Sequence, residues 1–290
     1  MRRAALWLIP AMLLAAFPLR AEDRINVVAS FSILADFARN AGGERVRVTS
    51  LVGPNGDVHV YTPTPADART VAEAGLVVVN GLGLEGWLPR LLQSAGGRAP
   101  IVTASRGVAP LKFGSETDPH AWQSVVNAKI YVANIRDALV EADPAGADDY
   151  RKNAEAYLAE LDGLDAQVRA AIAKIPPARR KLISTHDAFG YFAKTYGFET
   201  IAPLGVSTEA EPGARDIAGI ITRIKALGVR AVFPESISDE RLMRRISAET
   251  GASIGGTLYT DSLTDEKGNA PTYIALVRHN IRTLTSALGE

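Results

Sequence analysis

The chain of 290 residues contains no cysteine and only four histidines. Without cysteine, neither a disulfide framework nor a thiol for lipid attachment is possible. The chain also lacks an excess of charge of either sign, because 32 basic residues balance 32 acidic residues. We therefore expect no nucleic-acid partner and no attraction to an anionic membrane surface, and we do not expect the ligand to be a polyanion.

The N-terminal apolar run falls short of the about 20 clean residues that span a bilayer. Residues 1–21 begin with two arginines close together, continue with apolar residues and end on a small residue, which is the order of a cleavable signal peptide. Two prolines and an arginine interrupt the run, so an uncleaved membrane anchor is the less favoured alternative. We expect export and a soluble periplasmic protein whose mature chain begins near Ala21 or Glu22.

The longest regular pattern in the chain lies between residues 143 and 175. Apolar residues recur there at intervals of three or four, which predicts one amphipathic helix. Asp143 can cap its first amides, and Pro176 with Pro177 ends it. About thirty residues at roughly 1.5 Å each make a rod on the order of 45 Å long. We interpret this helix as a connection between two lobes, with membership of a larger helical bundle as the alternative.

Short apolar runs alternate with helical patterns on both sides of that helix. The runs lie at 25–30, 46–53, 76–81, 99–105, 181–185, 199–205 and 231–236. This alternation predicts an α/β fold of two lobes, each with a mainly parallel β-sheet flanked by helices, joined by one long rigid helix. The predicted organisation is a signal peptide at 1–21, an N-terminal lobe at 22–142, the connecting helix at 143–175 and a C-terminal lobe at 176–290.

Three of the four histidines stand where a ligand side chain would be useful. His59 lies in a polar loop, His120 lies just past the fourth predicted strand, and His186 follows the strand at 181–185 and begins a predicted helix. Sites are usually built on loops at strand ends, whereas a single histidine is more often polar surface or packed core. Together the three indicate a metal site, and His279, after an apolar helical run, is expected to be an ordinary helix residue.

A fourth donor is available from either of two acidic residues. Asp261 and Glu235 each follow an apolar run in the second half of the chain, so either could face the same cleft. Three neutral imidazoles and one carboxylate form a tetrahedral N/O set that suits Zn²⁺. The alternative for Asp261 is a solvated acid in a turn.

Several segments, taken together, are specific for one family. The chain resembles the substrate-binding proteins of zinc and manganese ABC transporters, the cluster 9 or cluster A-I metal-binding proteins, over essentially its whole mature length. The segments that carry the resemblance include VVASFSILADFARNAGG, GPNGDVHVYTPTPAD, VVNGLGLEGWL, DPHAW, STHDAFGYFAKTYG, FPESISDE and ISAETGASIGGTLYTDSL. In that family two α/β lobes are joined by one rigid long helix, and one divalent ion lies between them.

The resemblance also implies roles for particular residues. It implies the following metal ligands: His59, His120, His186 and Asp261. It implies that Glu235 is a close neighbour of the ion without being a ligand, and that Asp118 orients a ligand. Family members that favour manganese often carry glutamate at the position of His186, so a third imidazole favours Zn²⁺, with Mn²⁺ as the alternative.

The expected function is therefore capture of Zn²⁺ in the periplasm and its delivery to an inner-membrane ABC permease, without catalysis. We expect a monomer, and a periplasmic metallochaperone is a further partner to consider. Two other classes remain open. In a zinc-dependent hydrolase, Glu235 would act on a metal-bound water. In an organic-solute receptor, aromatic and apolar walls would surround the ligand.

Overall fold

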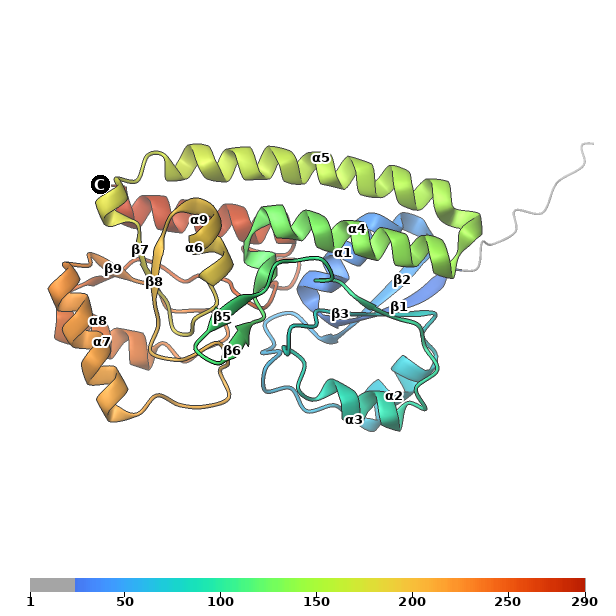
Figure 1. Cartoon of the computed structure of the whole chain (residues 1–290), viewed down its shortest axis with the longest axis horizontal. Helices are drawn as coiled ribbons and strands as arrows, with labels where there is room; N and C mark the ends of the chain where they lie inside the picture. The colour runs from blue at the N-terminus through green and yellow to red at the C-terminus, as the bar shows by residue number, and fades with distance from the viewer. Residues whose placement is uncertain (1–23, 290) are drawn as a thin grey trace, which may run out of the picture.

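The computed structural model describes residues 24–289 and shows two α/β lobes side by side beneath one long helix (Figure 1). The predicted fold class is confirmed. The predicted signal peptide at 1–21 lies outside the described residues. Among residues 24–289, no helix combines the length and the apolar character needed to cross a membrane.

The N-terminal lobe is built on a four-stranded parallel sheet in the order β2-β1-β3-β4. Its strands are β1 Ile25–Phe31, β2 Val46–Val52, β3 Leu76–Val79 and β4 Ile101–Thr103. The central strands β1 and β3 are buried over most of their length, which is why they appear in the sequence as continuous apolar runs. Helices α1 (Ser32–Gly42) and α4 (Val125–Ala142) cover one face of the sheet, and α2 (Pro65–Ala72) and α3 (Leu88–Ser94) lie on the other side (Figure 1).

The C-terminal lobe has two short parallel strand pairs. These are β7 (Lys181–Ile183) with β8 (Glu199–Ile201), and β9 (Ala231–Val232) with β10 (Ser253–Ile254). The amide of Phe233 donates to the carbonyl of Ile183 and joins the pairs. The surrounding helices are α6 Gly190–Tyr196, α7 Ala214–Leu227, α8 Arg241–Thr250 and α9 Tyr273–Leu288.

Beyond these strands, the parallel pairing continues through two isolated bridges. One bridge pairs His186 with Leu204, and the other pairs Glu235 with Leu258. The predicted helix from His186 is therefore wrong in its first turn, because His186 is held in extended pairing and α6 begins only at Gly190. Both bridges lie at strand ends, where the parallel architecture places ligand-binding side chains.

The sequence analysis did not predict the antiparallel hairpin formed by β5 (Leu111–Phe113) and β6 (Glu116–Asp118). The hairpin extends from the N-terminal lobe toward the C-terminal lobe (Figure 1). There, the hydroxyl of Tyr191 in α6 accepts a hydrogen bond from the Leu111 amide at 3.0 Å and donates one to the Asp118 carbonyl at 3.1 Å. The hairpin thus fixes the chain immediately before His120.

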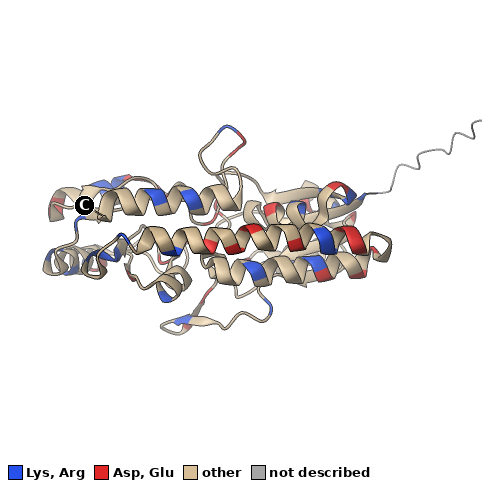
Figure 2. Cartoon of the chain, turned by 90° about the horizontal axis from the view of Figure 1, so that it is seen from above, with Lys and Arg blue, Asp and Glu red and all other residues tan. Residues whose placement is uncertain are grey.

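The long helix α5 runs from Ala147 to Ile172, 26 residues, after a 3-10 turn at Pro144–Gly146. At about 1.5 Å per residue it is about 39 Å long. It packs against α1 and α4 of the first lobe and α9 of the second, so it spans both lobes as predicted (Figure 1). Both acidic and basic residues occur along its length (Figure 2).

The predicted capping role of Asp143 is wrong. Because the 3-10 turn separates Asp143 from α5, its carboxylate makes no capping hydrogen bond to that helix. It instead accepts hydrogen bonds from the guanidinium of Arg45 at 3.1 Å and the hydroxyl of Tyr150 at 2.8 Å.

Buried aromatic side chains pack the boundary between the lobes on the side of α5. The rings of Phe37 in α1 and Tyr273 in α9 lie 4.8 Å apart edge to face, and the Tyr273 hydroxyl donates to the Trp122 carbonyl at 2.7 Å. The indole of Trp122 in turn donates to the carbonyl of Thr260 at 3.0 Å. These contacts are fully buried, so opening this side of the boundary would expose hydrophobic core.

Candidate metal centre

The structure brings together four side chains that are widely separated in the sequence, at the boundary between the lobes. His59 lies in the connection between β2 and α2, and His120 lies two residues after β6. His186 follows β7 and Asp261 follows β10. One donor atom from each residue lies within 4.8 Å of all the others. The structure thus places the three candidate histidines together, and the acidic residue in their midst is Asp261.

The donor atoms face one another at short distances. The Nε2 atom of His120 lies 3.3 Å from the Nε2 atoms of both His59 and His186. The Oδ2 atom of Asp261 lies 3.2 Å from His59 Nε2 and 3.1 Å from His186 Nε2, and its Oδ1 atom lies 3.7 Å from His120 Nε2. Each lobe supplies two of the four side chains, so an ion bound here would be held by both lobes.

Two further carboxylates orient the rings of His120 and His186. Asp118 Oδ1 lies 2.8 Å from His120 Nδ1 and also accepts the His120 amide at 2.9 Å. Glu235 Oε2 lies 2.5 Å from His186 Nδ1, and its Oε1 accepts the His186 amide at 2.9 Å. A carboxylate at Nδ1 keeps the proton on that nitrogen, so the lone pair of Nε2 is directed into the site.

Glu235 has no free oxygen for another role. Besides His186, it accepts hydrogen bonds from the amide of Thr185 at 2.8 Å and the hydroxyl of Thr260 at 3.1 Å, and it is 1% exposed. A general base must reach a water molecule with a free lone pair. Glu235 therefore fixes the position of His186. It is not available as a general base beside an open coordination position.

The cluster is buried, and among the described residues Asp261 forms ion pairs only with histidines and with no lysine or arginine. His120, His186 and Asp261 are 0% exposed, and neither oxygen of Asp261 has an oriented hydrogen bond despite the nearby imidazoles. Buried polar atoms are normally satisfied, and a buried carboxylate without compensation is costly. A divalent cation among these donors would supply the missing positive charge, and the N/O donor set suits a transition-metal ion.

The cluster also shifts the protonation of its own members. Burial acts to raise the pKa of Asp261, but the imidazoles of His186 and His120 outweigh it and hold this pKa well below its usual range. Burial acts to lower the pKa of His186, but the carboxylates of Glu235 and Asp261 outweigh it and hold this pKa well above its usual range. Without an ion, the cluster therefore retains a proton, and a metal ion has to displace it.

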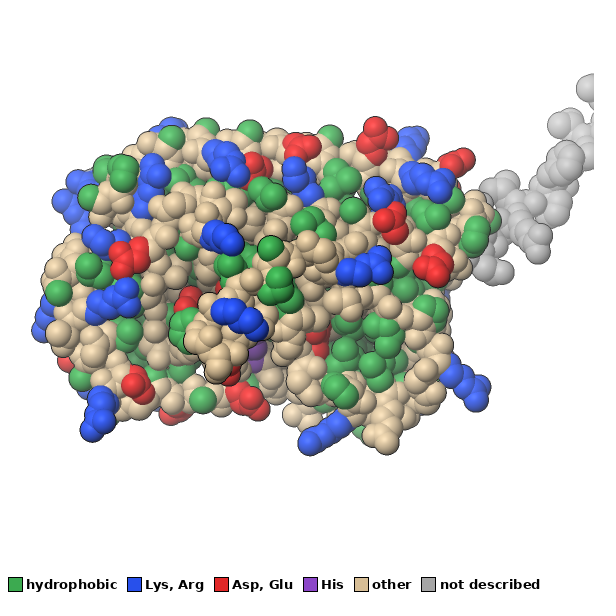
Figure 3. All heavy atoms as spheres, viewed as in Figure 1, with side chains coloured by type: hydrophobic (Ala, Val, Ile, Leu, Met, Phe, Trp, Pro, Cys, Tyr) green, Lys and Arg blue, Asp and Glu red, His purple; other side chains and the backbone are tan. Residues whose placement is uncertain are grey.

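Access to the cluster lies on the side of His59. Its side chain is 4% exposed, whereas those of His186 and Asp261 are 0% exposed. His59 lines a surface cavity of about 990 Å³, together with residues from both lobes such as Glu116 and Ser207. Figure 3 shows a histidine side chain at the bottom of a depression between the lobes.

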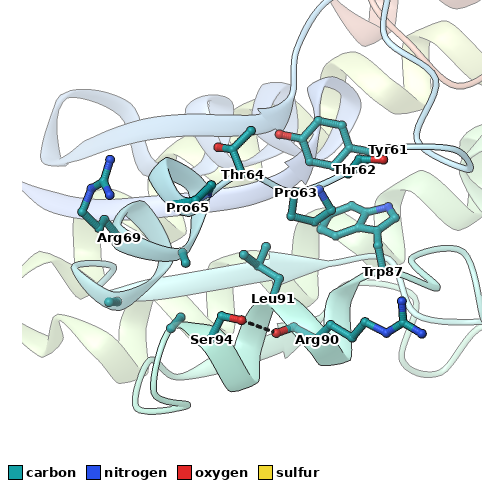
Figure 4. Close-up of a pocket in the computed structure, with 13 residues that line it drawn as sticks. Tyr61, Thr62, Pro63, Thr64, Pro65, Arg69, Trp87, Arg90, Leu91 and Ser94 are labelled. Atoms are coloured by element: carbon teal, nitrogen blue, oxygen red, sulfur yellow. Dashed lines mark hydrogen bonds between the residues drawn. The ribbon is translucent and has the colours of Figure 1, made fainter.

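The loop that carries His59 is held by its neighbours in the first lobe. Trp87 donates its indole N–H to the carbonyl of Val58 at 2.9 Å, and its ring lies 5.2 Å from that of Tyr61. Figure 4 shows these two rings at one end of an adjacent pocket of about 700 Å³ between α2 and α3. The loop ends at a capping box, in which Thr64 and Asp67 satisfy each other's amides and Asp67 also accepts the Tyr61 hydroxyl.

The sequence analysis missed the role of Asp57, which accepts the His59 amide at 2.9 Å. A signal was present, since Asp57-Val58-His59 has the same spacing as Asp118-Pro119-His120. The fourth histidine lies in helix α9, as the sequence predicted, and its Nε2 atom is 3.0 Å from the Thr257 carbonyl.

Two α/β lobes under a spanning helix, with a buried histidine–carboxylate cluster between them, define the class of bilobed binding proteins for divalent cations. Comparison with known proteins gives the family. A family model described as "Zinc-uptake complex component A periplasmic" matches residues 27–287, and the chain belongs to this family.

Curated relatives cover nearly the whole chain. The "Iron-binding protein YfeA" of Yersinia pestis is 36% identical over 278 residues, which cover 94% of this chain and 89% of that protein. The "Manganese-binding lipoprotein MntA" of Halalkalibacterium halodurans is 37% identical over 269 residues, which cover 92% of this chain and 90% of that protein.

Solved structures have the same fold. The periplasmic zinc binding protein TroA from Treponema pallidum superposes with a TM-score of 0.88 at 31% identity, covering 91% of this chain and 99% of that chain. A Mn-bound periplasmic metal binding protein from Candidatus Liberibacter asiaticus superposes with a TM-score of 0.84 at 31% identity, covering 91% of this chain and 100% of that chain.

The comparisons confirm the resemblance drawn from the sequence. The family is one of substrate-binding components of metal ABC transporters, which are not enzymes, so the zinc-dependent hydrolase finds no support. The anchored position of Glu235 agrees with this result. Relatives bind different divalent metals according to their names, so family membership establishes divalent-metal binding without selecting one ion.

Proposed function

We propose that this protein captures one Zn²⁺ ion between its lobes and delivers it to the membrane permease of an ABC transporter. The ligands in this proposal are His59, His120, His186 and Asp261. The main support is the environment of Asp261, whose two buried oxygens face three imidazole nitrogens without an oriented hydrogen bond. Donors of this kind bind zinc with Zn–N distances near 2.0–2.1 Å after a small inward movement.

Zinc is proposed on the chemistry of the donors. Three imidazoles and one carboxylate form an N-rich set, whereas manganese is better suited by sites richer in oxygen. For a given N/O site, affinity also rises from Mn²⁺ through Fe²⁺ to Zn²⁺ among these ions. The names of relatives include manganese-binding and iron-binding proteins, so Mn²⁺ and Fe²⁺ are the ions against which zinc has to be compared.

In this proposal, two carboxylates next to the ligands support the site. Asp118 and Glu235 hold the rings of His120 and His186 without binding the ion. Such outer carboxylates make the imidazole a better ligand and fix its direction. Since both lobes contribute ligands, the bound ion links them, and the permease would have to loosen this link to receive the ion.

The proposed location is the periplasm, supported by the residue order at 1–21 and the description of the family model. The chain has no cysteine for lipid attachment, although MntA and other relatives are named lipoproteins. A cleavable signal peptide and a soluble monomer are therefore part of the proposal. Loading by a periplasmic metallochaperone is compatible with an access cavity at His59.

The experiment is a metal titration of the metal-free protein against a chelator of known affinity. We expect one Zn²⁺ per chain, tighter binding of Zn²⁺ than of Fe²⁺ or Mn²⁺, and a loss of more than about a hundredfold in zinc affinity on alanine substitution of a ligand, since even outer-shell changes cost 10–100-fold. His279→Ala is the matched control and should bind zinc normally. Zinc binding that survives both His186→Ala and Asp261→Ala would contradict the assignment.

A further inference from the structure

His59 is held in a different way from His120. Asp57 stands two residues before His59, as Asp118 stands two residues before His120, and each aspartate accepts the backbone amide of its histidine at 2.9 Å. Asp118 uses the same oxygen to contact the ring of His120. Asp57 uses its second oxygen to accept a hydrogen bond from the hydroxyl of Thr208 at 2.6 Å.

This hydrogen bond crosses the boundary between the lobes. Asp57 lies in the connection between β2 and α2 of the first lobe, and Thr208 lies in the connection between β8 and α7 of the second. The carboxylate of Asp57 therefore joins the backbone of a metal-ligand candidate to the opposite lobe. The donor is neutral and the acceptor is charged, which makes this one of the stronger kinds of hydrogen bond.

The bond lies where the lobes meet solvent. His59 and Ser207 line one surface cavity of about 990 Å³, and Asp57 and Thr208 line another of about 470 Å³. Both Asp57 and Thr208 are half-buried. The bond therefore lies at the solvent-facing edge of the boundary between the lobes.

Contacts on the α5 side of the boundary are of another kind. The hydroxyls of Ser32 and Ser262 lie 3.4 Å apart in a buried position, and Gln123 donates to the carbonyl of Thr260 at 2.9 Å in the interior. These contacts surround the closed side of the cluster. An ion that leaves past His59, the most exposed of the four side chains, would leave beside the loop that carries Asp57 and not past these buried contacts.

We propose that the hydrogen bond between Asp57 and Thr208 sets the lifetime of the bound ion by holding His59 in place. The inference rests on the proposed function. Release begins with movement of the His59 loop, because the other three side chains are fully buried. While Thr208 holds Asp57, Asp57 holds the amide of His59, and the loop cannot swing away. Asp57 and Thr208 are positioning residues, since neither side chain is a proposed ligand.

The rate of zinc dissociation tests this inference. Zinc-loaded protein is mixed rapidly with an excess of chelator, and wild type is compared with Thr208→Val, which is nearly isosteric and lacks the hydroxyl. We expect dissociation to become about tenfold faster, the effect of losing one hydrogen bond to a charged group. The association rate should change little. An unchanged dissociation rate in Thr208→Val would overturn the inference.

Two matched variants separate the hydroxyl from a general structural effect. Thr208→Ser keeps the donor and should restore slow dissociation. Thr222→Val removes a hydroxyl that bonds only to the Ala218 carbonyl within α7, and it should match wild type. If Thr208→Ser releases zinc as fast as Thr208→Val, the hydroxyl is not the cause and the inference is wrong.

A double-mutant cycle tests the connection through Asp57. Asp57→Ala should itself speed dissociation, and adding Thr208→Val to it should have no further effect, because the shared bond is already absent. A full effect of Thr208→Val in the Asp57→Ala background would contradict the connection. Failure of the proposed function would show as absence of zinc from wild type, whereas failure of this inference would show as equal release rates in proteins that bind zinc.

Discussion

The Oδ2 atom of Asp261 in the C-terminal lobe lies 3.2 Å from the Nε2 atom of His59 in the N-terminal lobe. This is the most direct link between the lobes at the cluster, and it brings a buried carboxylate against a histidine at the solvent-facing edge. An ion between the two atoms would replace a weak, unoriented contact by two coordinate bonds. Because Asp261 and His59 belong to different lobes, binding an ion between them would also hold the lobes together.

Zinc affinity should rise with pH. The His186 pKa is raised and the Asp261 pKa is lowered, since mutual attraction outweighs burial, so the metal-free cluster keeps a proton at neutral pH. Zinc must displace that proton, so the apparent affinity should continue to increase above about pH 6.5, the ordinary histidine pKa. Zinc affinity measured from pH 5.5 to 8.5 checks this, and a flat profile would count against histidine ligation.

The stability of the metal-free protein should depend on pH through the same two groups, His186 and Asp261, and in opposite directions. The raised pKa of His186 stabilises the fold fully below about pH 6.5, and this contribution is lost as pH rises through the higher folded value. The lowered pKa of Asp261 stabilises the fold above about pH 3.9, and this is lost as pH falls through the folded value. The increase in melting temperature caused by zinc should therefore be larger above about pH 6.5 than below it. Thermal denaturation with and without zinc across this range is the measurement, and an equal increase at every pH would contradict the account.

The outer carboxylates should affect affinity without being ligands. Asp118→Asn and Glu235→Gln keep the shape of the side chain and remove its charge, so each should weaken zinc binding by about 10–100-fold while leaving one ion per chain. Asp137→Asn, at an exposed position paired with Arg136, is the control and should bind as wild type does. Competition with a chelator gives the affinities, and loss of the bound ion altogether would mean that these carboxylates coordinate it.

A substitution at Gly190 would displace the side chain of Asp118 without changing Asp118 itself. A Cβ atom at this position would collide with the Asp118 carboxylate, which orients His120. Gly190→Ala should therefore lower zinc affinity by about tenfold, the lower end of the range for an outer-shell change. Gly163→Ala is the matched control, because a Cβ there meets no atom within 4 Å, and in the exposed middle of α5 it should stabilise the helix by up to about 1 kcal/mol. Equal zinc affinity in both variants would show that Asp118 can move without consequence.

Zinc release should involve small movements and no large rotation of the lobes. The Tyr157 hydroxyl donates from α5 to Asp36 of the first lobe, while Tyr196 of the second lobe donates to Asp165 of α5. A helix tied to both lobes resists hinge closure. Small-angle scattering of metal-free and zinc-loaded protein should give nearly the same radius of gyration, and a change typical of a hinge-closing receptor would refute this expectation.

The three histidines of the cluster could be predicted from the sequence, because the residues next to each one in the chain indicate a loop or a strand end. Each follows a recognisable apolar run or lies in a polar loop, and parallel strands bring such ends to one edge of a sheet. The neighbouring residues do not show whether Asp261 or Glu235 is the fourth ligand, since both follow apolar runs. The structure separates them because the oxygens of Glu235 are taken by Thr185, His186 and Thr260, whereas those of Asp261 face the imidazoles.

Other features depended on contacts between distant parts of the chain. The three-residue strands of the β5–β6 hairpin are too short to give a periodic signal, and Tyr191 of the other lobe holds the hairpin. The extended conformation at His186 comes from its bridge to Leu204, which overrides the local helical pattern. Asp57 and Thr208 are 151 positions apart, and no spacing rule connects them.

Diffraction from a crystal of the zinc-loaded protein, recorded at the zinc absorption edge, tests the central claim most directly. The account predicts a single anomalous peak at the boundary between the lobes, about 2.0–2.1 Å from the Nε2 atoms of His59, His120 and His186 and about 2.0–2.2 Å from an oxygen of Asp261. A peak elsewhere, or an ion held by fewer than three of these histidines, would contradict it.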